Sequence, residues 1–458
     1  MFSKKFILQA ACAGLAAVIS LAAHPVGAQT SSESKRIEQL EQEIAELKRE
    51  VSALKKESAP VPEGKLKRTV TYDGKTYVEK AVVEEQKPPV YVQQRGPELK
   101  LVLGGFIQAN FEGIDVSPFE GRFGQTALKE RFRLRRARIN LTGDFAEQFD
   151  FKIEGDFEQS DGISSSRTDF SGTDIFVNWH QFPWAQVKVG QWKAPFGLEQ
   201  LTPDTSLFTI ERTLPTGAIT PERQIGAQLW GQPFANIWPD EKDLLTYYAG
   251  VFNGNGRNIT NNDNNNFMFV GRLESTLFKS KMWGESYVKL GADVLNSRDD
   301  AGTNISQTLN LKVNSDGSLS PFTLPTAAER TAWSVDAWLR LGRFDLIGEY
   351  LEEYVNGRTV NGVPGMRDFT TNGFYVTGGY FLIPKKLQAV VQWQALNPGQ
   401  KGSDGIHSIL GGLNYYIHGD DLKLMVNYIH TWSDFREANP QFGRDDFNEV
   451  IGRLQVMF

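Results

Sequence analysis

The sequence lacks thiol chemistry and long apolar runs. Its 458 residues include a single cysteine, Cys12, which lies in a segment that we expect to be removed from the mature chain. A disulfide, a thiolate nucleophile and a Cys–metal site are therefore excluded. After residue 28 no run of eighteen apolar residues occurs, which excludes ordinary transmembrane helices. A transmembrane β-barrel is not excluded, because its strands alternate apolar and polar residues and their average composition resembles that of a soluble protein.

Ligands for a metal and groups for catalysis are also scarce. The four histidines beyond residue 28 are His180, His407, His418 and His430, and they show neither an HExxH motif nor a paired spacing. The asparagine-rich run 261–266 offers oxygen ligands without the spacing of an EF-hand, so we interpret it as a polar loop tip. We predict no metal site, no cofactor, no enzymatic activity and no nucleic-acid partner.

The amino-terminal segment has the pattern of an export signal. Lys4 and Lys5 precede an apolar stretch over 6–23, and the small residues of 26–28 suit signal peptidase. We predict a signal peptide over 1–28. Cys12 belongs to its apolar region rather than to a lipid anchor, because Gln9 stands where a lipoprotein signal has an aliphatic residue.

A heptad repeat follows within 29–57. Its apolar residues are separated alternately by three and four positions: Ile37, Leu40, Ile44, Leu47, Val51 and Leu54. In a parallel, in-register assembly the flanking charges pair attractively, as Arg36–Glu41, Glu43–Lys48 and Glu50–Lys55. We predict a coiled coil that joins copies of this chain. Branched residues at the a positions with Leu at d favour two strands, and a lone amphipathic helix is the alternative for so short a repeat.

Residues 58–97 have the composition of a linker. Prolines stand at both of its ends: Pro60, Pro62, Pro88, Pro89 and Pro97. The turn sequence Tyr72-Asp73-Gly74-Lys75 predicts a hairpin between them. We assign no chemistry to this segment.

From residue 98 to residue 458 the chain is a series of short alternating segments with no convincing amphipathic helix. The clearest one, 149–158, has apolar residues and Gly155 on one face and a charge at every position of the other. A water-filled lumen tolerates such a charged row, which a soluble sandwich rarely exposes. Sixteen segments of this kind occur, near 101–111, 131–141, 149–158, 173–182, 185–192, 223–230, 244–252, 267–274, 286–295, 330–340, 343–351, 374–381, 387–396, 407–416, 423–431 and 448–458. We therefore predict an all-β fold, a 16-stranded antiparallel transmembrane β-barrel over 98–458, with counts of fourteen or eighteen left open.

The connections between these segments alternate in length. Residues 182–184 and 341–343 form tight turns, whereas 253–266, 296–329 and 352–373 are long and polar. The last segment alternates up to the terminal Phe458. Both features are typical of bacterial outer-membrane barrels.

Four segments carry a family resemblance. They are Arg131-Phe132-Arg133-Leu134-Arg135-Arg136-Ala137-Arg138, Phe182-Pro183-Trp184, Val189-Gly190-Gln191-Trp192-Lys193-Ala194-Pro195-Phe196-Gly197-Leu198-Glu199 and Ile210-Glu211-Arg212-Thr213-Leu214-Pro215. In these segments the chain resembles the phosphate-selective porin O and P family, most closely over 98–230. The resemblance implies a homotrimeric outer-membrane barrel whose inward-folded loops narrow a pore lined by cationic side chains. Some members carry an N-terminal periplasmic coiled coil. The heptads alone predict self-association, and the resemblance implies that the assembly is a trimer.

The strongest basic patch lies at 129–138, where six cations accompany one acid. Arginine suits an anion path because its planar fork binds phosphate oxygens in pairs and stays charged. Strict alternation would place Phe132 and Leu134 on the same side as Arg136, so all the arginines can face the lumen only if a bulge lies near Arg135-Arg136. The alternative use of Arg136 and Arg138 is in cross-strand ion pairs with Glu154 and Asp156.

The segment 193–223 is the best candidate for a constriction, because it is rich in proline and charge and poor in alternation. Its cations could face a passing anion, but its acids Glu199, Asp204 and Glu211 could neutralise the positive charge. The alternative interpretation is a surface loop that is stabilised by its own ion pairs. Residues 98–458 hold 34 Lys and Arg against 43 Asp and Glu, so any anion preference must be local. The predicted pore-lining residues are Arg131, Arg133, Arg135, Arg136, Arg138, Lys193, Arg212 and Arg223.

These features predict a passive, anion-selective porin for phosphate or similar small oxyanions. The alternative is a general or cation-tolerant diffusion porin of the same fold in which the arginines are structural. A sugar-conducting aromatic path also stays open, because stacking residues and membrane-interface residues look alike in sequence. We expect the protein in the outer membrane of a Gram-negative bacterium, as a homotrimer with its coiled coil in the periplasm and with membrane lipid and small anions as partners.

Overall fold

The computed structural model describes residues 66–72, 77–83, 90–92, 99–116, 130–157, 170–281, 284–305, 312–362 and 364–458. The chain divides into two units, 1–86 and 87–458. The predicted signal peptide and coiled coil lie outside the described residues, as does much of the predicted linker. Within the described ranges no helix is long and apolar enough to cross a membrane.

The described part of the first unit is a two-stranded antiparallel sheet. Strand β1 (Leu66–Tyr72) pairs with β2 (Tyr77–Val83), and Tyr72 stands opposite Tyr77. Both strands contain several β-branched residues, which favour the extended backbone. The antiparallel pairing of β1 with β2 agrees with the predicted hairpin, whose turn residues 73–76 lie outside the described residues.

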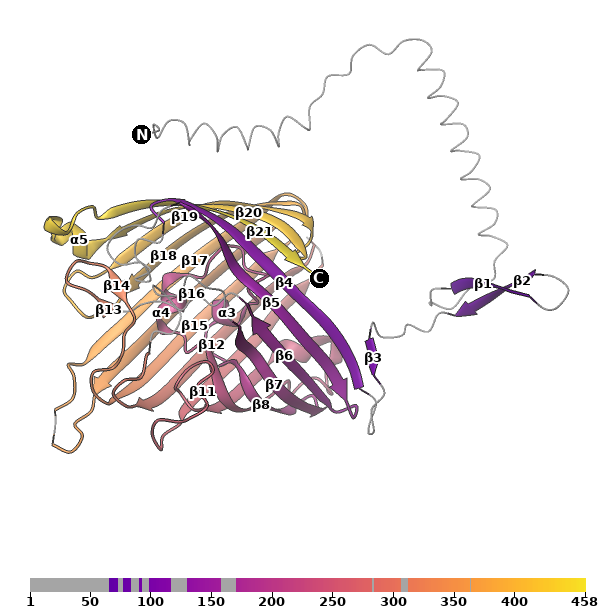
Figure 1. Ribbon diagram of the computed structural model, residues 1–458, viewed down its shortest axis with the longest axis horizontal. Helices are drawn as coiled ribbons and strands as arrows, with labels where there is room; N and C mark the ends of the chain where they lie inside the picture. Colours follow the sequence, from indigo (N-terminus) through magenta and orange to yellow (C-terminus); the bar gives the residue numbers. More distant parts are fainter. Residues whose placement is uncertain are drawn as a thin grey trace, which may run out of the picture. The chain divides into compact units, whose positions relative to one another are not determined.

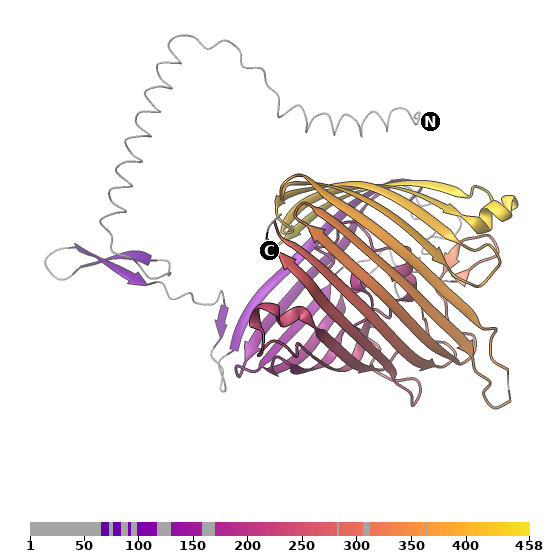
Figure 2. The same cartoon turned by 180° about the vertical axis from the view of Figure 1, so that it is seen from behind.

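The second unit is a closed antiparallel barrel (Figures 1 and 2). Its sixteen strands are β4 (Leu99–Ile114), β5 (Arg131–Phe145), β6 (Phe149–Asp156), β7 (Ser171–Phe182), β8 (Ala185–Lys193), β9 (Arg223–Gly231), β10 (Thr246–Phe252), β11 (Met268–Ser280), β12 (Ser286–Asp299), β15 (Ala328–Leu341), β16 (Phe344–Gly357), β17 (Phe369–Ile383), β18 (Leu387–Asn397), β19 (Ile406–His418), β20 (Leu422–Ser433) and β21 (Asp446–Met457). Strand β21 pairs with β4 and closes the wall, and the short β3 (Val90–Val92) pairs with the start of β4. The predicted count of sixteen strands is confirmed.

The two ends of the barrel differ in the length of their connections. Tight turns such as 183–184 and 342–343 alternate with long connections such as 194–222 and 300–327. Short elements lie in the connections: α3 (Leu198–Leu201), α4 (Leu214–Ile219), η2 (Pro239–Leu244), β13 (Lys312–Val313), β14 (Leu319–Ser320), α5 (Asp434–Ala438) and η3 (Pro440–Phe442). We call the end of the barrel that carries the tight turns the short-turn end. In outer-membrane barrels such short turns face the periplasm.

The wall reverses the usual arrangement of a soluble protein. Apolar side chains are exposed on the outer face, as at Val294 (62% exposed), Val335 (48%) and Val391 (61%). Their sequence neighbours Asp293, Asp336 and Gln392 are buried on the inner face. An apolar band around a polar interior is what a bilayer requires of a closed sheet.

One part of the interior is apolar instead. Phe196 and Ile219 of the connection 194–222 pack with Phe322 and Leu324 of the connection 300–327 against inward-facing residues of the wall, among them Leu351 on β16. These connections therefore fold into the barrel and cover part of its inner face. The same burial places α3 and α4 inside the barrel (Figure 1).

Candidate functional site

A bulge in β5 turns its arginines toward the lumen. Leu134 pairs with Ala109 of β4 and Arg136 pairs with the adjacent Gln108, so Arg135 is the extra residue in the ladder. The bulge shifts the alternation of side chains by one position. Phe132 is therefore 88% exposed on the outer face, although both of its neighbours in sequence are arginines. The bulge predicted near Arg135-Arg136 is confirmed.

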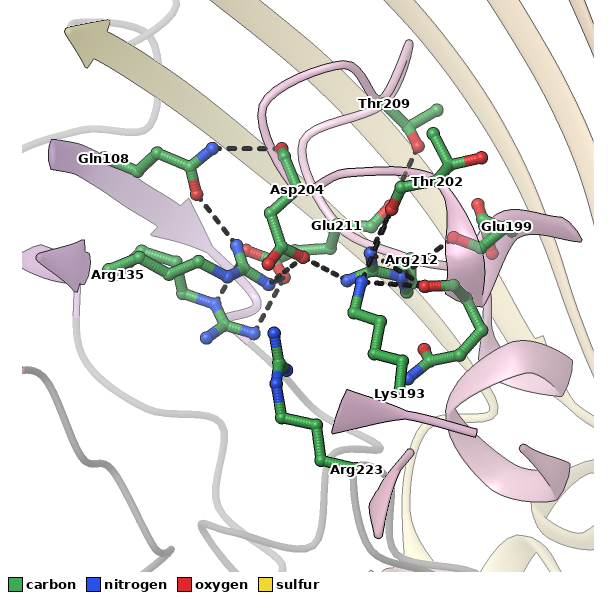
Figure 3. A network of polar contacts seen from close by, with 12 residues as sticks. Gln108, Arg135, Lys193, Glu199, Thr202, Asp204, Thr209, Glu211, Arg212 and Arg223 are labelled. Carbon is green, nitrogen blue, oxygen red and sulfur yellow. Dashed lines mark hydrogen bonds and ion pairs between the residues drawn. The ribbon is translucent and has the colours of Figure 1, made fainter. Parts of the chain in front are cut away.

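The connection 194–222, which we call the inner loop, meets these arginines with its two central carboxylates (Figure 3). Asp204 accepts from Arg138 Nη1 at 2.6 Å, and Arg136 Nη2 lies 3.5 Å from the same carboxylate. Glu211 forms a two-pronged pair with Arg135 at 2.9 and 3.0 Å. The inner loop is thus bound to β5 by charge-assisted hydrogen bonds.

The other predicted cations of this region brace the loop or its base. Arg212 pairs with Asp204 and donates to the backbone oxygens of Glu199 (3.1 Å) and Thr202 (2.7 Å). Lys193 Nζ donates to the backbone oxygen of Gln200 at 2.7 Å. At the base, Arg223 donates to Asp174 at 2.7 Å. The eight predicted residues are therefore grouped on the strands β5, β8 and β9 and on the inner loop.

The cross-strand ion pairs that the sequence left as an alternative are present. Arg138 Nε donates to Asp156 at 2.8 Å, and its Nη1 lies 3.7 Å from Glu154. Arg131 and Arg133 both pair with Glu112 of β4, at 2.6 and 3.8 Å. The arginines of β5 thus have a structural role whatever else they do.

Sequence reasoning missed several members of this network. Arg453 of β21 pairs with Glu211 at 2.6 Å and donates to Asn110 at 2.8 Å. Lys152 of β6 pairs with Glu154 at 2.8 Å, and Gln108 accepts from Arg136 at 2.9 Å. The alternation of the last strand with its apolar residues was the one signal that could have placed Arg453 in the lumen.

The ion-pair network carries more positive than negative charge. Among the described residues it contains seven cations, Arg135, Arg136, Arg138, Lys152, Arg212, Arg223 and Arg453. They share five carboxylates, Glu154, Asp156, Asp174, Asp204 and Glu211. We call this set the basic network. Counted over the described residues, the basic network is locally cationic, whereas the overall composition of the barrel domain is acidic.

The two loop carboxylates are held in their charged form. Burial by itself would raise the pKa of Asp204, but Arg136, Arg212, Lys193 and Arg138 hold this pKa well below its usual range. Burial likewise opposes the charge of Glu211, and Arg135 with Arg453 holds its pKa well below the usual range. Both carboxylates are therefore ionised at neutral pH.

The opposite wall binds the inner loop through acids instead. Glu349 of β16 accepts from the backbone N–H groups of Leu198 at 2.8 Å and Glu199 at 3.2 Å, and Asp293 of β12 accepts from that of Gly197 at 3.2 Å. The inner loop thus presents carboxylates to the basic wall and N–H donors to the acidic wall. This complementarity holds it across the lumen.

One group of carboxylates has the spacing of a metal site. Asp293, Asp336 and Glu349 each offer an oxygen, and these oxygens lie within 4.8 Å of one another. Arg272 Nη1 already donates to Asp293 and to Asp336 at 2.7 Å. Because the guanidinium stands at the place of a cation, the arrangement favours an ion-pair cluster over a metal centre.

The closed sixteen-stranded wall with an inward-folded loop is the architecture of an outer-membrane channel. The sequence model of the phosphate-selective porin O and P family matches residues 103–458, and the chain belongs to this family. The resemblance noted in the sequence is thereby confirmed.

Solved structures with the same fold are distant in sequence. OmpT of Vibrio cholerae in its trimer form has 10% identity and a TM-score of 0.51, over 79% of this chain and 99% of that chain. The outer-membrane channel DcaP of Acinetobacter baumannii has 13% identity and a TM-score of 0.51, over 80% and 99%. A loop L8 deletion mutant of OmpT has 11% identity, with the same TM-score, over 79% and 99%. A comparison with curated proteins found no match.

Proposed function

We propose that this porin is a passive pore that prefers anions and carries phosphate or similar small oxyanions across the outer membrane. The observation that supports the proposal is the surplus of cations in the basic network, where seven cations share five carboxylates within the described residues. A pore for an anion needs donors that replace part of its hydration and release it again. Arginines that are partly neutralised by carboxylates bind weakly enough to do so.

The exposure of the side chains divides the arginines into two groups. Those of Arg138 and Arg223 are 7% and 3% exposed, so their charge serves the attachment of the loop and its base. Those of Arg131 and Arg135 are 27% and 18% exposed. These two more exposed side chains are the ones that a passing anion would contact.

We further propose a homotrimer in the outer membrane with a periplasmic coiled coil. The support is the in-register heptad pairing within 29–57. A trimer form is also named for OmpT, which shares the fold. Light scattering of the full-length protein in detergent would report a mass of three chains, and deletion of 29–57 would lower the fraction of trimer. A monomeric full-length protein would refute this assembly.

A general diffusion porin is the second candidate. It is favoured by the carboxylate partners of the arginines and by the acidic composition of 98–458. The two candidates differ in their response to phosphate. A general porin would give the same chloride conductance in its presence, because it has no site at which phosphate dwells.

The test is phosphate block of chloride conductance through single channels in planar bilayers. We expect phosphate to reduce the chloride current in a concentration-dependent manner, and we expect R135Q to raise the half-blocking concentration about threefold. R444Q is the control, because Arg444 pairs with Asp115 outside the basic network. Conductance that is indifferent to phosphate in the unmodified protein would overturn the phosphate proposal and leave the fold untouched.

A further inference from the structure

Aromatic side chains face the lumen near the short-turn end, where lipid contact cannot explain them. Trp230 on β9 stacks on Tyr248 of the neighbouring β10, with ring centroids 6.0 Å apart and an interplanar angle of 7°. Their sequence neighbours Leu229 and Ala249 are the exposed residues of the outer face. The Trp230–Tyr248 pair is therefore on the inner face, and both rings are only half-buried.

A lysine, Lys188, lies beside this pair. The Nζ atom of Lys188 on β8 lies 4.5 Å from the ring centroid of Phe176, 5.6 Å from that of Trp230 and 5.8 Å from that of Trp192. Cation–π attraction fixes the ammonium group and leaves its N–H groups available. Within the described ranges its Nζ makes no ion pair and no hydrogen bond to a protein acceptor, yet it still touches solvent.

The other lysines of this wall differ in their partners. Lys152 pairs with Glu154 at 2.8 Å, and Lys289 pairs with Glu274 at 3.2 Å. The acids on the strands beside Lys188 are engaged elsewhere, since Asp150 accepts from Asn178 at 2.8 Å and Asp174 pairs with Arg223 at 2.7 Å. Lys188 thus offers a positive charge that rings hold in place and that makes no ion pair within the part of the chain that the structure describes.

We propose that Lys188 and the Trp230–Tyr248 pair form a lumenal binding site for organic anions that carry a flat ring, such as aromatic carboxylates. The carboxylate would accept from the ammonium group of Lys188, and the ring would pack against the two aromatic side chains. An inorganic oxyanion or a short aliphatic acid would gain only the first contact. The proposal rests on the proposed channel function, since the lumen must admit solutes.

The proposed site lies at a second position along the pore, apart from the basic network. Lys188 and Lys193 are five residues apart on β8, which corresponds to about 16 Å along an extended strand. Lys193 and its strand partner Arg223 lie at the base of the inner loop, whereas Lys188 is three residues from the start of β8 at the short-turn end. A solute that has passed the basic network would meet Lys188 on its way to the short-turn end.

The test compares three blockers of potassium chloride current through the full-length protein in planar bilayers: benzoate, acetate and phosphate. We expect the half-blocking concentration of benzoate to be about tenfold below that of acetate. In K188M, benzoate should need the same concentration as acetate, while phosphate block stays unchanged. K289M is the matched control, because Lys289 is a lumenal lysine near the same end and its partner is a carboxylate. K289M should change the half-blocking concentrations of all three anions by the same factor, so that the ratio between benzoate and acetate is preserved.

A second variant covers the case in which K188M does not insert. W230L keeps the charge of Lys188 and removes the stacked ring, and it should raise the half-blocking concentration of benzoate while acetate stays unchanged. Equal block by benzoate and acetate in the unmodified protein would overturn this proposal, as would an unchanged ratio in K188M. The phosphate measurement reports separately on the function proposed for the basic network.

Discussion

Arg138 Nη1 lies 2.6 Å from Asp204 Oδ2, and this contact joins the barrel wall to the inner loop. The Nε atom of the same guanidinium donates to Asp156 on the adjacent strand at 2.8 Å. One buried arginine therefore links β5, β6 and the loop. Because all three side chains are buried, removal of the arginine leaves carboxylates without a counter-ion in a place that water reaches poorly.

The first prediction concerns this link. R138Q should destabilise the barrel by about 3 kcal/mol, the usual cost of breaking a buried ion pair from one side. It should also loosen the inner loop, so that single-channel current becomes noisier. The temperature at which the folded band is lost in heat-modifiability gels measures the first effect, and current recordings measure the second.

R444Q serves as the control for R138Q. The side chain of Arg444 is 52% exposed, and exposed pairs contribute little to stability. If R138Q and R444Q had the same melting temperature and the same current noise, the link between wall and loop would have no mechanical role.

The second prediction concerns selectivity. D204N removes a carboxylate that Arg136, Arg138 and Arg212 share, so the basic network would retain four carboxylates for seven cations. We expect the ratio of anion to cation permeability to rise about twofold. D240N, in the exposed turn at η2, should leave the ratio unchanged. A fall of the ratio in D204N would show that the network does not act on permeant ions.

The third prediction concerns pH. The pKa values of Asp204 and Glu211 are held well below their ordinary values, so their contribution to stability is complete above the ordinary pKa of about 4. This contribution to stability is lost as the pH falls below about 4 and passes through the lowered pKa values of the two carboxylates. We expect the difference in thermal stability between the unmodified protein and D204N to be constant between pH 5 and pH 8 and to decline below about pH 4. A loss of this difference near neutral pH would contradict the assignment of a charged Asp204.

The fourth prediction concerns the bulge. Deletion of Arg135 removes the extra residue, so Leu134 would alternate directly with Arg136 and Phe132 would stay on the outer face. This variant should therefore insert as normal, heat-modifiable protein. Deletion of Arg133 is the matched variant, because it shifts the side chains before the bulge by one position and turns Phe132 toward the polar lumen. We expect a large loss of inserted protein for the second variant. Equal insertion of the two deletion variants would mean that the register of β5 can shift without cost.

Much of the fold could be predicted from the sequence, because alternation along strands is a local signal. The sixteen strands, the alternation of short and long connections and the bulge near Arg135-Arg136 follow from the order of apolar and charged residues. The inner loop was recognisable as a segment without alternation. The boundaries were less certain, and most strands extend beyond the predicted segments, because polar residues at strand ends carry no apolar signal.

The partners of the candidate site could not be predicted in the same way. Which acid meets which arginine depends on how the inner loop crosses the lumen, and neither Asp204 with Arg138 nor Glu211 with Arg453 is close in sequence. The apolar patch around Leu351 was also hidden, because a strand covered on its inner face by a loop and on its outer face by lipid loses its alternation.

The most direct test of the account is the zero-current potential of the unmodified porin across a tenfold gradient of potassium chloride. A lumen with a cationic surplus in the basic network should give a potential of the sign that reports chloride as the more permeable ion. A potential of the opposite sign would contradict the central claim, because the acidic composition of the barrel would then outweigh the local surplus.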